Sequence, residues 1–198
     1  MVKLYYCRIP DEVDEEIIPF LSEYRKNKLA RTTSLKLRRQ GICAELLLEK
    51  AAQNIYKRPL PLLTDSNGKP YFDGGVLHFN ISHSGDWVAC AVAENEIGLD
   101  IQTEAEYKAE LCKRFFYIDE QKYILEAENK NSAFTEIWCK KEAKLKESGL
   151  GLKAGLASFS VLENEMDFAY GKIAQLHYAV SAGDINKTKI ILEEVKLL

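Results

Sequence analysis

The stretch from residue 133 to residue 152 places the tightest constraint on how this chain can fold. At the 3.6-residue period of an α-helix, a mostly apolar set of side chains falls on one face and a charged set on the other. The apolar face carries Phe134, Ile137, Trp138, Lys141 and Leu145, and the charged face carries Lys140, Lys144 and Glu147. Ser148-Gly149 and Gly151 end the pattern, as glycine often does at a helix C-terminus. The stretch therefore predicts an amphipathic helix.

Glu142 does not belong to the charged face of this helix. It lies one turn after Trp138, at the margin of the apolar face, and Lys146 lies one turn further on. Carboxylates rarely occupy such a margin unless they are paired or bound to a metal. An ordinary helix with a Glu-Lys pair worth a few tenths of a kcal/mol is the simpler explanation, and taken alone the stretch favours it.

The composition is that of an ordinary globular protein, with 198 residues of which 46% are hydrophobic and 29% charged. This length suits one large domain or two small ones, with a core that needs no disulfide or structural metal. The net charge of -3 argues against a general nucleic-acid binder, which is normally strongly basic.

The five cysteines are widely spaced and include no CxxC pair, so they predict neither a zinc site nor a disulfide framework. We expect most of them to be small buried side chains in a reducing compartment. The N-terminal segment 1–16 has no apolar signal region, and no run approaches the roughly 20 apolar residues that cross a bilayer. These features predict a cytoplasmic protein without membrane contacts.

Hydrophobic periodicity predicts a mixed α and β chain. Strands are expected at residues 2–9, in a hairpin at 76–93, and at 97–102, 157–162, 176–181 and 189–195. Helices are expected at residues 11–24 and 34–56, besides the one described above. The composition becomes polar and helical near Glu104, which predicts an N-terminal half at 1–103 and a C-terminal half at 104–198.

Polar side chains stand at notable positions on two predicted strands. His83, flanked by Ser82 and Ser84, lies where a strand reaches its turn, a setting suited to meeting a ligand oxygen. In the strand at 97–102, Asp100 points to the same side as Gly98 and Gln102. An acid beside a glycine on a buried strand leaves room for a partner, although an edge strand with a wet face explains the pattern equally well.

Basic residues gather before and inside the helix predicted at 34–56. They are Arg25, Lys26, Lys28, Arg31, Lys36, Arg38 and Arg39. A solvated helix face and a phosphate-binding patch both explain the cluster, and on its own the first explanation is favoured because basic runs are common on helices.

Four short motifs stand in order along the chain: Gly68-Lys69-Pro70, FNISHS at 79–84, GLDI at 98–101 and WCKKEAKLK at 138–146. Their order and spacing resemble the 4'-phosphopantetheinyl transferases, in particular the monomeric type that activates nonribosomal peptide and polyketide synthetases. The resemblance implies an α+β fold of two similar subdomains related by a pseudo-twofold axis. Each subdomain would pack a small antiparallel sheet on a long helix, with the active site between them.

The resemblance also implies the reaction, the cofactor and the partners. A phosphopantetheine group would pass from coenzyme A to a serine of an acyl or peptidyl carrier protein, releasing adenosine 3',5'-bisphosphate, with Mg²⁺ as the metal. The implied metal ligands are Asp100 and Glu142, with Gln102 as a third candidate. The implied coenzyme A contacts are Lys28, Arg39, Lys69, Ser82, His83, Lys141 and Lys146, and the implied catalytic residues are Asp100, Glu142 and Lys146.

These assignments agree with the chemistry of the groups involved. Mg²⁺ prefers carboxylate and phosphate oxygens and neutralises the charge that builds on the pyrophosphate during attack. Lysines share that charge, and Glu142 could also accept the serine proton. The two roles of Glu142, ligand and general base, stay open.

Gln102 departs from the family pattern, which often has a second acid two residues after the aspartate. An amide oxygen can bind Mg²⁺ but brings no charge, so we expect weaker metal binding without loss of function. A non-catalytic module that binds coenzyme A or a carrier protein is the alternative function, and an unrelated enzyme is disfavoured because the chain has no P-loop motif.

The carrier protein is expected to dock beyond Gln102, on a surface that includes Arg114, Phe115 and Phe116. Aromatic residues there could equally belong to the core.

Overall fold

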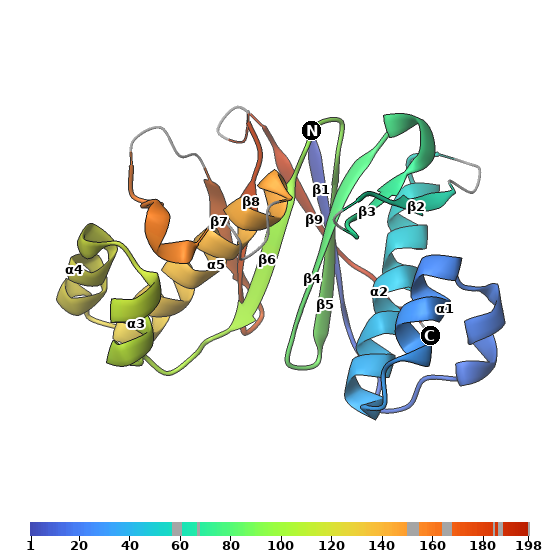
Figure 1. Cartoon of the computed structure of the whole chain (residues 1–198), viewed down its shortest axis with the longest axis horizontal. Helices are drawn as coiled ribbons and strands as arrows, with labels where there is room; N and C mark the ends of the chain where they lie inside the picture. Colours follow the sequence, from blue (N-terminus) through green and yellow to red (C-terminus); the bar gives the residue numbers. More distant parts are fainter. Residues whose placement is uncertain are drawn as a thin grey trace. The chain divides into compact units, whose positions relative to one another are not determined.

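A long helix packed on a small sheet forms the centre of each of two parts of the chain (Figure 1). The structure is a computed structural model, and it describes residues 1–56, 61–66, 68–149, 155–163, 168–183, 185 and 188–197. The first unit comprises Met1–Asn95 with Lys189–Leu198, and the second comprises Glu96–Thr188. The mixed α+β fold with small sheets and helices confirms the predicted fold class; the pseudo-twofold relation stays a prediction.

The first unit is built on a four-stranded sheet in the order β4-β5-β1-β9. Its strands are β1 (Val2–Arg8), β4 (His78–Ser84), β5 (Trp87–Ala93) and β9 (Ile190–Glu194), and β2 (Leu62–Thr64) pairs separately with β3 (Pro70–Phe72). Helix α2 (Leu35–Gln53) packs on the sheet and α1 (Glu23–Ala30) packs on α2, while η1 (Glu15–Phe20) and η2 (Asp73–Gly75) are short 3-10 turns. The pair β1 and β9 runs parallel, whereas the other pairs in this sheet are antiparallel as expected.

The second unit has an antiparallel sheet in the order β6-β8-β7, and α5 crosses one face of it (Figure 1). Its strands are β6 (Gly98–Thr103), β7 (Phe168–Ile173) and β8 (Leu176–Ser181). Its helices are α3 (Ala109–Phe115), α4 (Ile118–Glu126), α5 (Lys130–Ser148) and the 3-10 turn η4 (Leu156–Ser158). Asn129 caps α5 by accepting the amide of Ser132, and Gly149 ends it in the left-handed conformation, as predicted.

The boundary between the units differs from the one expected after residue 103. Strand β6 belongs to the second unit because it pairs with β8 and packs on α5, and β9 returns to the first unit because it pairs with β1. Pairing between strands far apart in the chain decides to which unit β6 and β9 belong. A change in local composition carries no information about such pairing.

Two predicted elements are wrong. The helix expected at 11–24 is a 3-10 turn followed by α1, because Pro19 lacks an amide hydrogen and Ser22 caps a new helix by accepting the amide of Arg25. The strand expected at 157–162 is η4 and a turn, and its backbone groups bind side chains of α4 and α5 instead of a strand. Strand β7 was not predicted.

The predicted hairpin and the predicted strand at 97–102 are confirmed by β4, β5 and β6. All five cysteines are buried and unpaired, as expected. Within the ranges that the structure describes, no helix is both long and apolar enough to cross a bilayer.

Candidate active site

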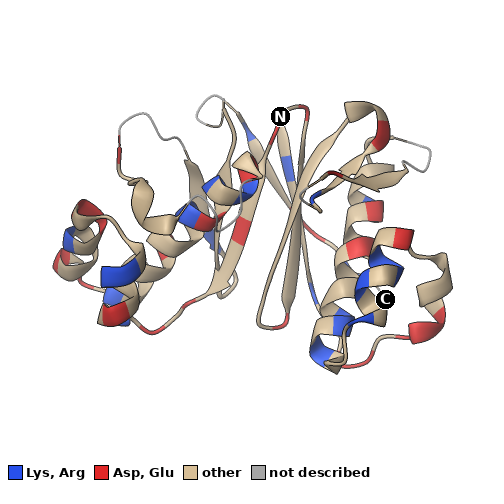
Figure 2. Ribbon diagram, in the orientation of Figure 1, with Lys and Arg blue, Asp and Glu red and all other residues tan. Residues whose placement is uncertain are grey.

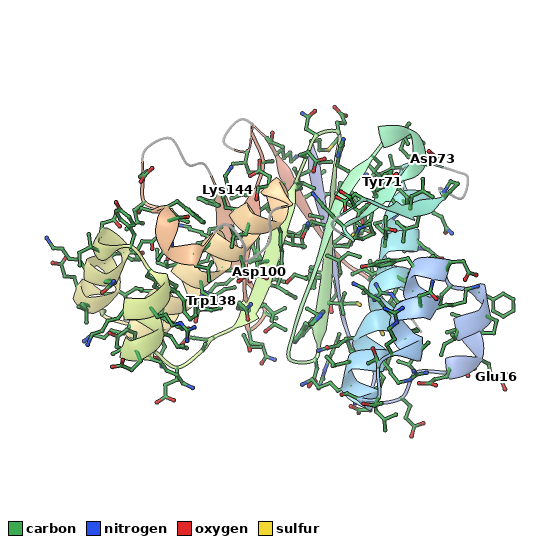
Figure 3. All side chains as sticks on the ribbon, in the orientation of Figure 1. Glu16, Tyr71, Asp73, Asp100, Trp138 and Lys144 are labelled. Carbon is green, nitrogen blue, oxygen red and sulfur yellow. The ribbon has the colours of Figure 1, made fainter. Side chains whose placement is uncertain are left out.

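Strand β6 and helix α5 bring a group of charged side chains together in the second unit. Figure 3 labels Asp100 on β6 and Trp138 on α5. The side chain of Asp100 is almost fully buried, and Lys146 Nζ lies 2.5 Å from its Oδ1. Gln102 Nε2 donates a hydrogen bond of 2.9 Å to the other oxygen, Oδ2. The structure thus joins residues 46 positions apart in the chain into one cluster.

Glu142 belongs to the same cluster through its charge. It is partly buried, and burial together with the nearby charge of Asp100 raises the pKa of its carboxyl group, an effect that Lys146 partly opposes. Two carboxylates that repel each other in a partly buried setting form a site that favours a cation.

Strand β6 and helix α5 can approach each other closely because Gly98 has no side chain at their contact. A Cβ atom on Gly98 would lie 1.9 Å from the carbonyl oxygen of Ala143 and 2.5 Å from the amide nitrogen of Glu147. Cys139 Sγ also donates to the carbonyl oxygen of Asp100 at 3.2 Å. The room beside Asp100 that the sequence suggests is therefore occupied by the backbone of α5.

The donor set fits Mg²⁺. Asp100 and Glu142 provide carboxylate oxygens, and Gln102, whose nitrogen donates to Asp100, carries an amide oxygen of a kind that can bind Mg²⁺. Among the described residues, no group of three or more His, Cys, Asp or Glu side chains could hold a metal. A site with two carboxylates suits Mg²⁺, which usually keeps several waters and takes further ligands from substrate phosphates.

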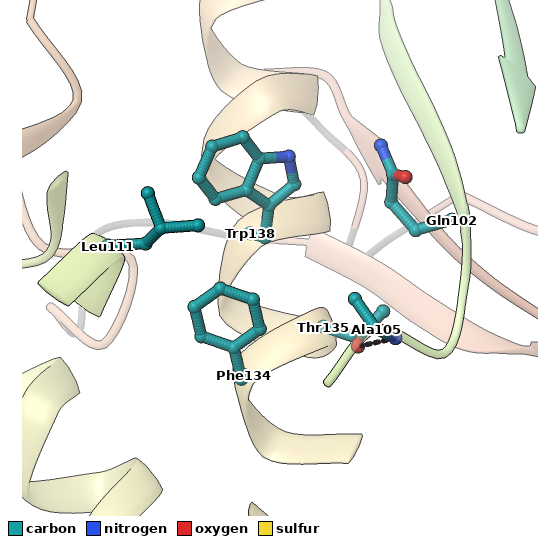
Figure 4. A pocket seen from close by; sticks show the side chains of 6 residues that line it. All are labelled: Gln102, Ala105, Leu111, Phe134, Thr135 and Trp138. Carbon is teal, nitrogen blue, oxygen red and sulfur yellow. Dashed lines mark hydrogen bonds between the residues drawn. The ribbon is translucent and has the colours of Figure 1, made fainter. Parts of the chain in front are cut away.

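An apolar cavity of about 260 Å³ opens beside Gln102 (Figure 4). It is lined by Gln102, Ala105, Leu111, Phe134, Thr135 and Trp138. Thr135 Oγ1 accepts the amide of Ala105 at 2.9 Å, which ties the chain after β6 to α5 at the cavity wall. The cavity can therefore take an uncharged group next to the charged cluster.

Lys141 has a different environment from the one predicted for it. Its side chain is fully buried, its Nζ lies 2.9 Å from Glu120 Oε2, and it donates to the carbonyl oxygens of Leu156 and Phe159 at 2.8 and 2.5 Å. An ammonium group with its donors occupied inside the protein cannot also contact a pyrophosphate. We therefore remove Lys141 from the predicted coenzyme A contacts.

Sequence reasoning missed Glu120. Its signal was present, because Phe116, Glu120 and Ile124 follow one another at four-residue spacing and all three are buried. A carboxylate in such a row has to be paired, which is the argument applied to Glu142.

The predicted docking residues divide between core and surface. Phe116 is 2% exposed and packs against Phe134 and Trp138, so it belongs to the core. Phe115 is partly buried, edge-on to Trp138. Arg114 is exposed, with its guanidinium 5.0 Å from the centre of the Phe115 ring. Large apolar side chains are exposed on the next segment, at Tyr117, Ile118 and Leu125.

In the first unit, the structure brings the N-terminal half of α2 to the end of β4. Gln40 Nε2 donates to the carbonyl oxygen of Gly85, in the turn that follows β4, at 3.1 Å. Ser82 is buried near this end of β4 and His83 is exposed. Arg39, beside Gln40, donates from Nη1 to the carbonyl oxygen of Asp11. Three of the predicted coenzyme A contacts, Arg39, Ser82 and His83, thus share one neighbourhood.

The remaining two predicted contacts lie elsewhere in the first unit. Lys69 sits on the loop before β3, which Asp65 closes by accepting the Lys69 amide at 2.8 Å. Lys28 is exposed near the end of α1, with its ammonium 2.5 Å from the hydroxyl of Tyr24 and above the Tyr24 ring. Lys and Arg positions, coloured blue on the ribbon of Figure 2, are frequent on α1 and at the start of α2.

Comparison with known proteins reveals clear relatives. The family pattern described as the 4'-phosphopantetheinyl transferase superfamily matches residues 96–184. The chain is 30% identical to 4'-phosphopantetheinyl transferase gsp of Aneurinibacillus migulanus over 176 residues, which are 83% of this chain and 73% of the relative. It is 33% identical to psf-1 of Bacillus pumilus, covering 76% and 67% of the two chains, and 31% identical to Sfp of Bacillus subtilis strain 168, covering 77% and 71%.

Proposed function

Because the chain belongs to the 4'-phosphopantetheinyl transferase superfamily, we propose that it transfers phosphopantetheine from coenzyme A to a serine of an acyl or peptidyl carrier protein. Mg²⁺ is the proposed metal, and adenosine 3',5'-bisphosphate is the second product. The observation that carries the proposal is the cluster of Asp100, Glu142 and Lys146 on β6 and α5, two carboxylates and a lysine in one partly buried site.

Each member of the cluster has a proposed task. Asp100 and Glu142 would hold Mg²⁺, with the amide oxygen of Gln102 as a third candidate ligand, and the ion would supply positive charge against the negative charge on the pyrophosphate. Lys146, whose side chain is 29% exposed, contacts Asp100 in this structure and would turn to the phosphates of coenzyme A. Its ammonium group would there stabilise the phosphate charge together with the ion.

Glu142 is also the proposed general base. The serine oxygen forms a bond to phosphorus, the bond to the leaving adenosine bisphosphate breaks, and the serine proton passes to a base. The carboxylate of Glu142 lies beside Asp100 and Lys146 in the proposed site and can take the serine proton directly or through a water. In the first unit, Arg39, Ser82, His83, Lys69 and Lys28 are the proposed contacts to the phosphates of coenzyme A.

The direct test is a mass measurement. An apo-carrier protein incubated with the enzyme, coenzyme A and Mg²⁺ should gain one phosphopantetheine group. Tight binding of coenzyme A or carrier without any mass gain would instead favour the alternative, a non-catalytic binding module of the same fold.

Replacing Gln102 by Glu tests the third ligand. Gln102→Glu adds a carboxylate beside Asp100, so we expect Mg²⁺ to bind the coenzyme A complex about ten times more tightly, equivalent to about 1.4 kcal/mol. Calorimetric titration of Mg²⁺ into that complex measures the change. An unchanged affinity would mean that residue 102 does not face the ion.

The exposed apolar residues at the start of α4 are the proposed carrier-docking surface, with Arg114 as its charged neighbour. Ile118 is 74% exposed and projects from the segment that follows the core residue Phe116. Ile118→Asp places a charge that repels an acidic carrier, so we expect the KM for carrier to rise about tenfold, at unchanged KM for coenzyme A. The matched control is Phe20→Asp, which changes an 83% exposed side chain of the first unit; equal effects of both variants would contradict docking at Ile118.

A further inference from the structure

Lys141 is a motif lysine that the proposed reaction leaves without a task. It is enclosed completely, and its three donors all have partners: the carboxylate of Glu120 and the carbonyl oxygens of Leu156 and Phe159. Its ammonium also lies 4.3 Å from the centre of the Phe159 ring. The side chain therefore extends from α5 into the protein interior, where its ammonium group makes all three of its hydrogen bonds.

Both carboxylate oxygens of Glu120, the partner of Lys141, also accept hydrogen bonds. Its Oε2 accepts the amide of Tyr117 at 2.7 Å as well as Lys141, and its Oε1 accepts the amide of Val161 at 2.7 Å. Next to it, Asp119 accepts the hydroxyl of Ser160 at 2.7 Å. One buried ion pair thus ties together α5, the start of α4 and the segment 156–161.

Burying an ion pair is a poor way to gain stability, because well-packed apolar residues often do as well or better. The pair instead restricts the orientation of the groups it joins, because each hydrogen bond is strong only within a narrow range of angles. Three directed bonds from one side chain fix the rotation of α5 about its own axis. The residue that follows Lys141 on this helix is Glu142, the proposed metal ligand and base.

A small rotation of α5 would have a large effect on Glu142. A side-chain end roughly 6 Å from the axis of a helix moves by about 2 Å when the helix turns by about 20°. Mg²⁺ requires ligand distances near 2.0–2.1 Å in nearly ideal geometry, so an error of that size removes a ligand. Asp100 belongs to β6 and would not follow the rotation.

We propose that Lys141 and Glu120 are positioning residues that set the rotation of α5, and with it the direction in which Glu142 meets the metal. The pair touches no substrate and takes no part in the chemical steps. The inference rests on the proposed function, because it concerns the metal site of that reaction.

The test separates geometry from stability. Lys141→Met removes one charge, and the double variant Lys141→Met with Glu120→Gln removes both charges while keeping an amide oxygen that can accept the backbone amide of Val161. The matched control is Lys140→Met, which breaks the pair between Lys140 and Glu136 (2.6 Å) on the same helix. For each variant, calorimetry measures Mg²⁺ binding to the coenzyme A complex and coenzyme A binding without metal, below the lowest melting temperature.

We expect Lys141→Met to weaken Mg²⁺ binding at least tenfold, with coenzyme A binding in the absence of metal unchanged within about twofold. The double variant should recover part of the melting temperature that Lys141→Met loses, but not the Mg²⁺ affinity, and Lys140→Met should keep the wild-type Mg²⁺ affinity. Because Lys141→Met leaves a buried carboxylate unpaired, it can fail to fold, and the double variant then carries the test.

Recovery of both melting temperature and Mg²⁺ affinity in the double variant would overturn the inference and leave a purely structural pair. A wild-type protein that neither binds Mg²⁺ with coenzyme A nor modifies a carrier would contradict the proposed function itself. The two failures are therefore distinguishable by the behaviour of the wild-type protein.

Discussion

Glu142→Gln is expected to slow phosphopantetheine transfer about a thousandfold, which corresponds to about 4 kcal/mol of transition-state stabilisation. The amide keeps the size of the side chain but removes a charged metal ligand and the proposed base. Transfer is measured as mass gain of the carrier protein under saturating coenzyme A and Mg²⁺.

The same substitution is expected to leave the metal-free protein at least as stable as the wild type. Burial and Asp100 raise the pKa of Glu142, so the folded protein holds that proton more tightly than the unfolded chain does. The stabilisation from this group is present at low pH and is lost as the pH rises through the raised pKa. At neutral pH the charge therefore costs stability, and the neutral amide removes that cost.

The matched control for this prediction is Glu147→Gln, on the same helix. Glu147 accepts hydrogen bonds from Lys144 and from Ser181 and has no proposed role in the reaction. The transfer rate of the Glu147→Gln protein should stay within about threefold of the wild-type rate. A Glu142→Gln protein that keeps more than a tenth of the wild-type rate would contradict the assignment of Glu142.

Gly98→Ala is expected to lower the free energy of unfolding by about 3 kcal/mol, toward the upper end of overpacking effects. The added Cβ would lie 1.9 Å from the carbonyl oxygen of Ala143, and that atom belongs to the backbone of α5 and cannot rotate away. For a chain of this size the melting temperature should fall by about 6–12 °C.

The substitution should also weaken Mg²⁺ binding, because β6 and α5 can only accommodate the methyl group by moving apart, which separates Asp100 from Glu142. Gly183→Ala is the control, since a Cβ there meets no atom within 4 Å and the change should stay within about 0.5 kcal/mol. Thermal unfolding and Mg²⁺ titration of both variants give the comparison. Equal stability of the two proteins would show that the close approach at residue 98 is not needed.

The helix α5 and the strands β4, β5 and β6 are predictable from sequence because short-range patterns specify them. Apolar side chains at helical spacing, an asparagine cap and a terminal glycine act within a few residues of one another, as do the alternation and the turn of the hairpin. The candidate cluster is not specified by either segment alone. Asp100 and Glu142 each occupy a position where a carboxylate needs a partner, but an ordinary helix or a wet edge strand also explains each pattern, and the order of the four motifs links the two residues.

Contacts between segments far apart in the chain decide the features that the sequence does not predict. Lys141 carries the same motif signal as Lys146, yet one side chain is sealed against Glu120 and the other reaches Asp100 with part of its surface exposed. Phe116 and Ile118 are two residues apart and both apolar, yet one lies in the core and the other in solvent. No local pattern distinguishes the members of either pair.

The amino-acid sequence alone was sufficient to predict the main helix and several of the strands, because propensity, capping and periodicity are local properties. Only the tertiary structure decided which lysine pairs with which carboxylate, where the chain divides and how closely β6 approaches α5. Those outcomes depend on burial and on hydrogen-bond partners far apart in the chain, such as Lys146 with Asp100 and Val2 with Lys189. The charge and the solvent access of a group are set by the neighbours that folding brings to it.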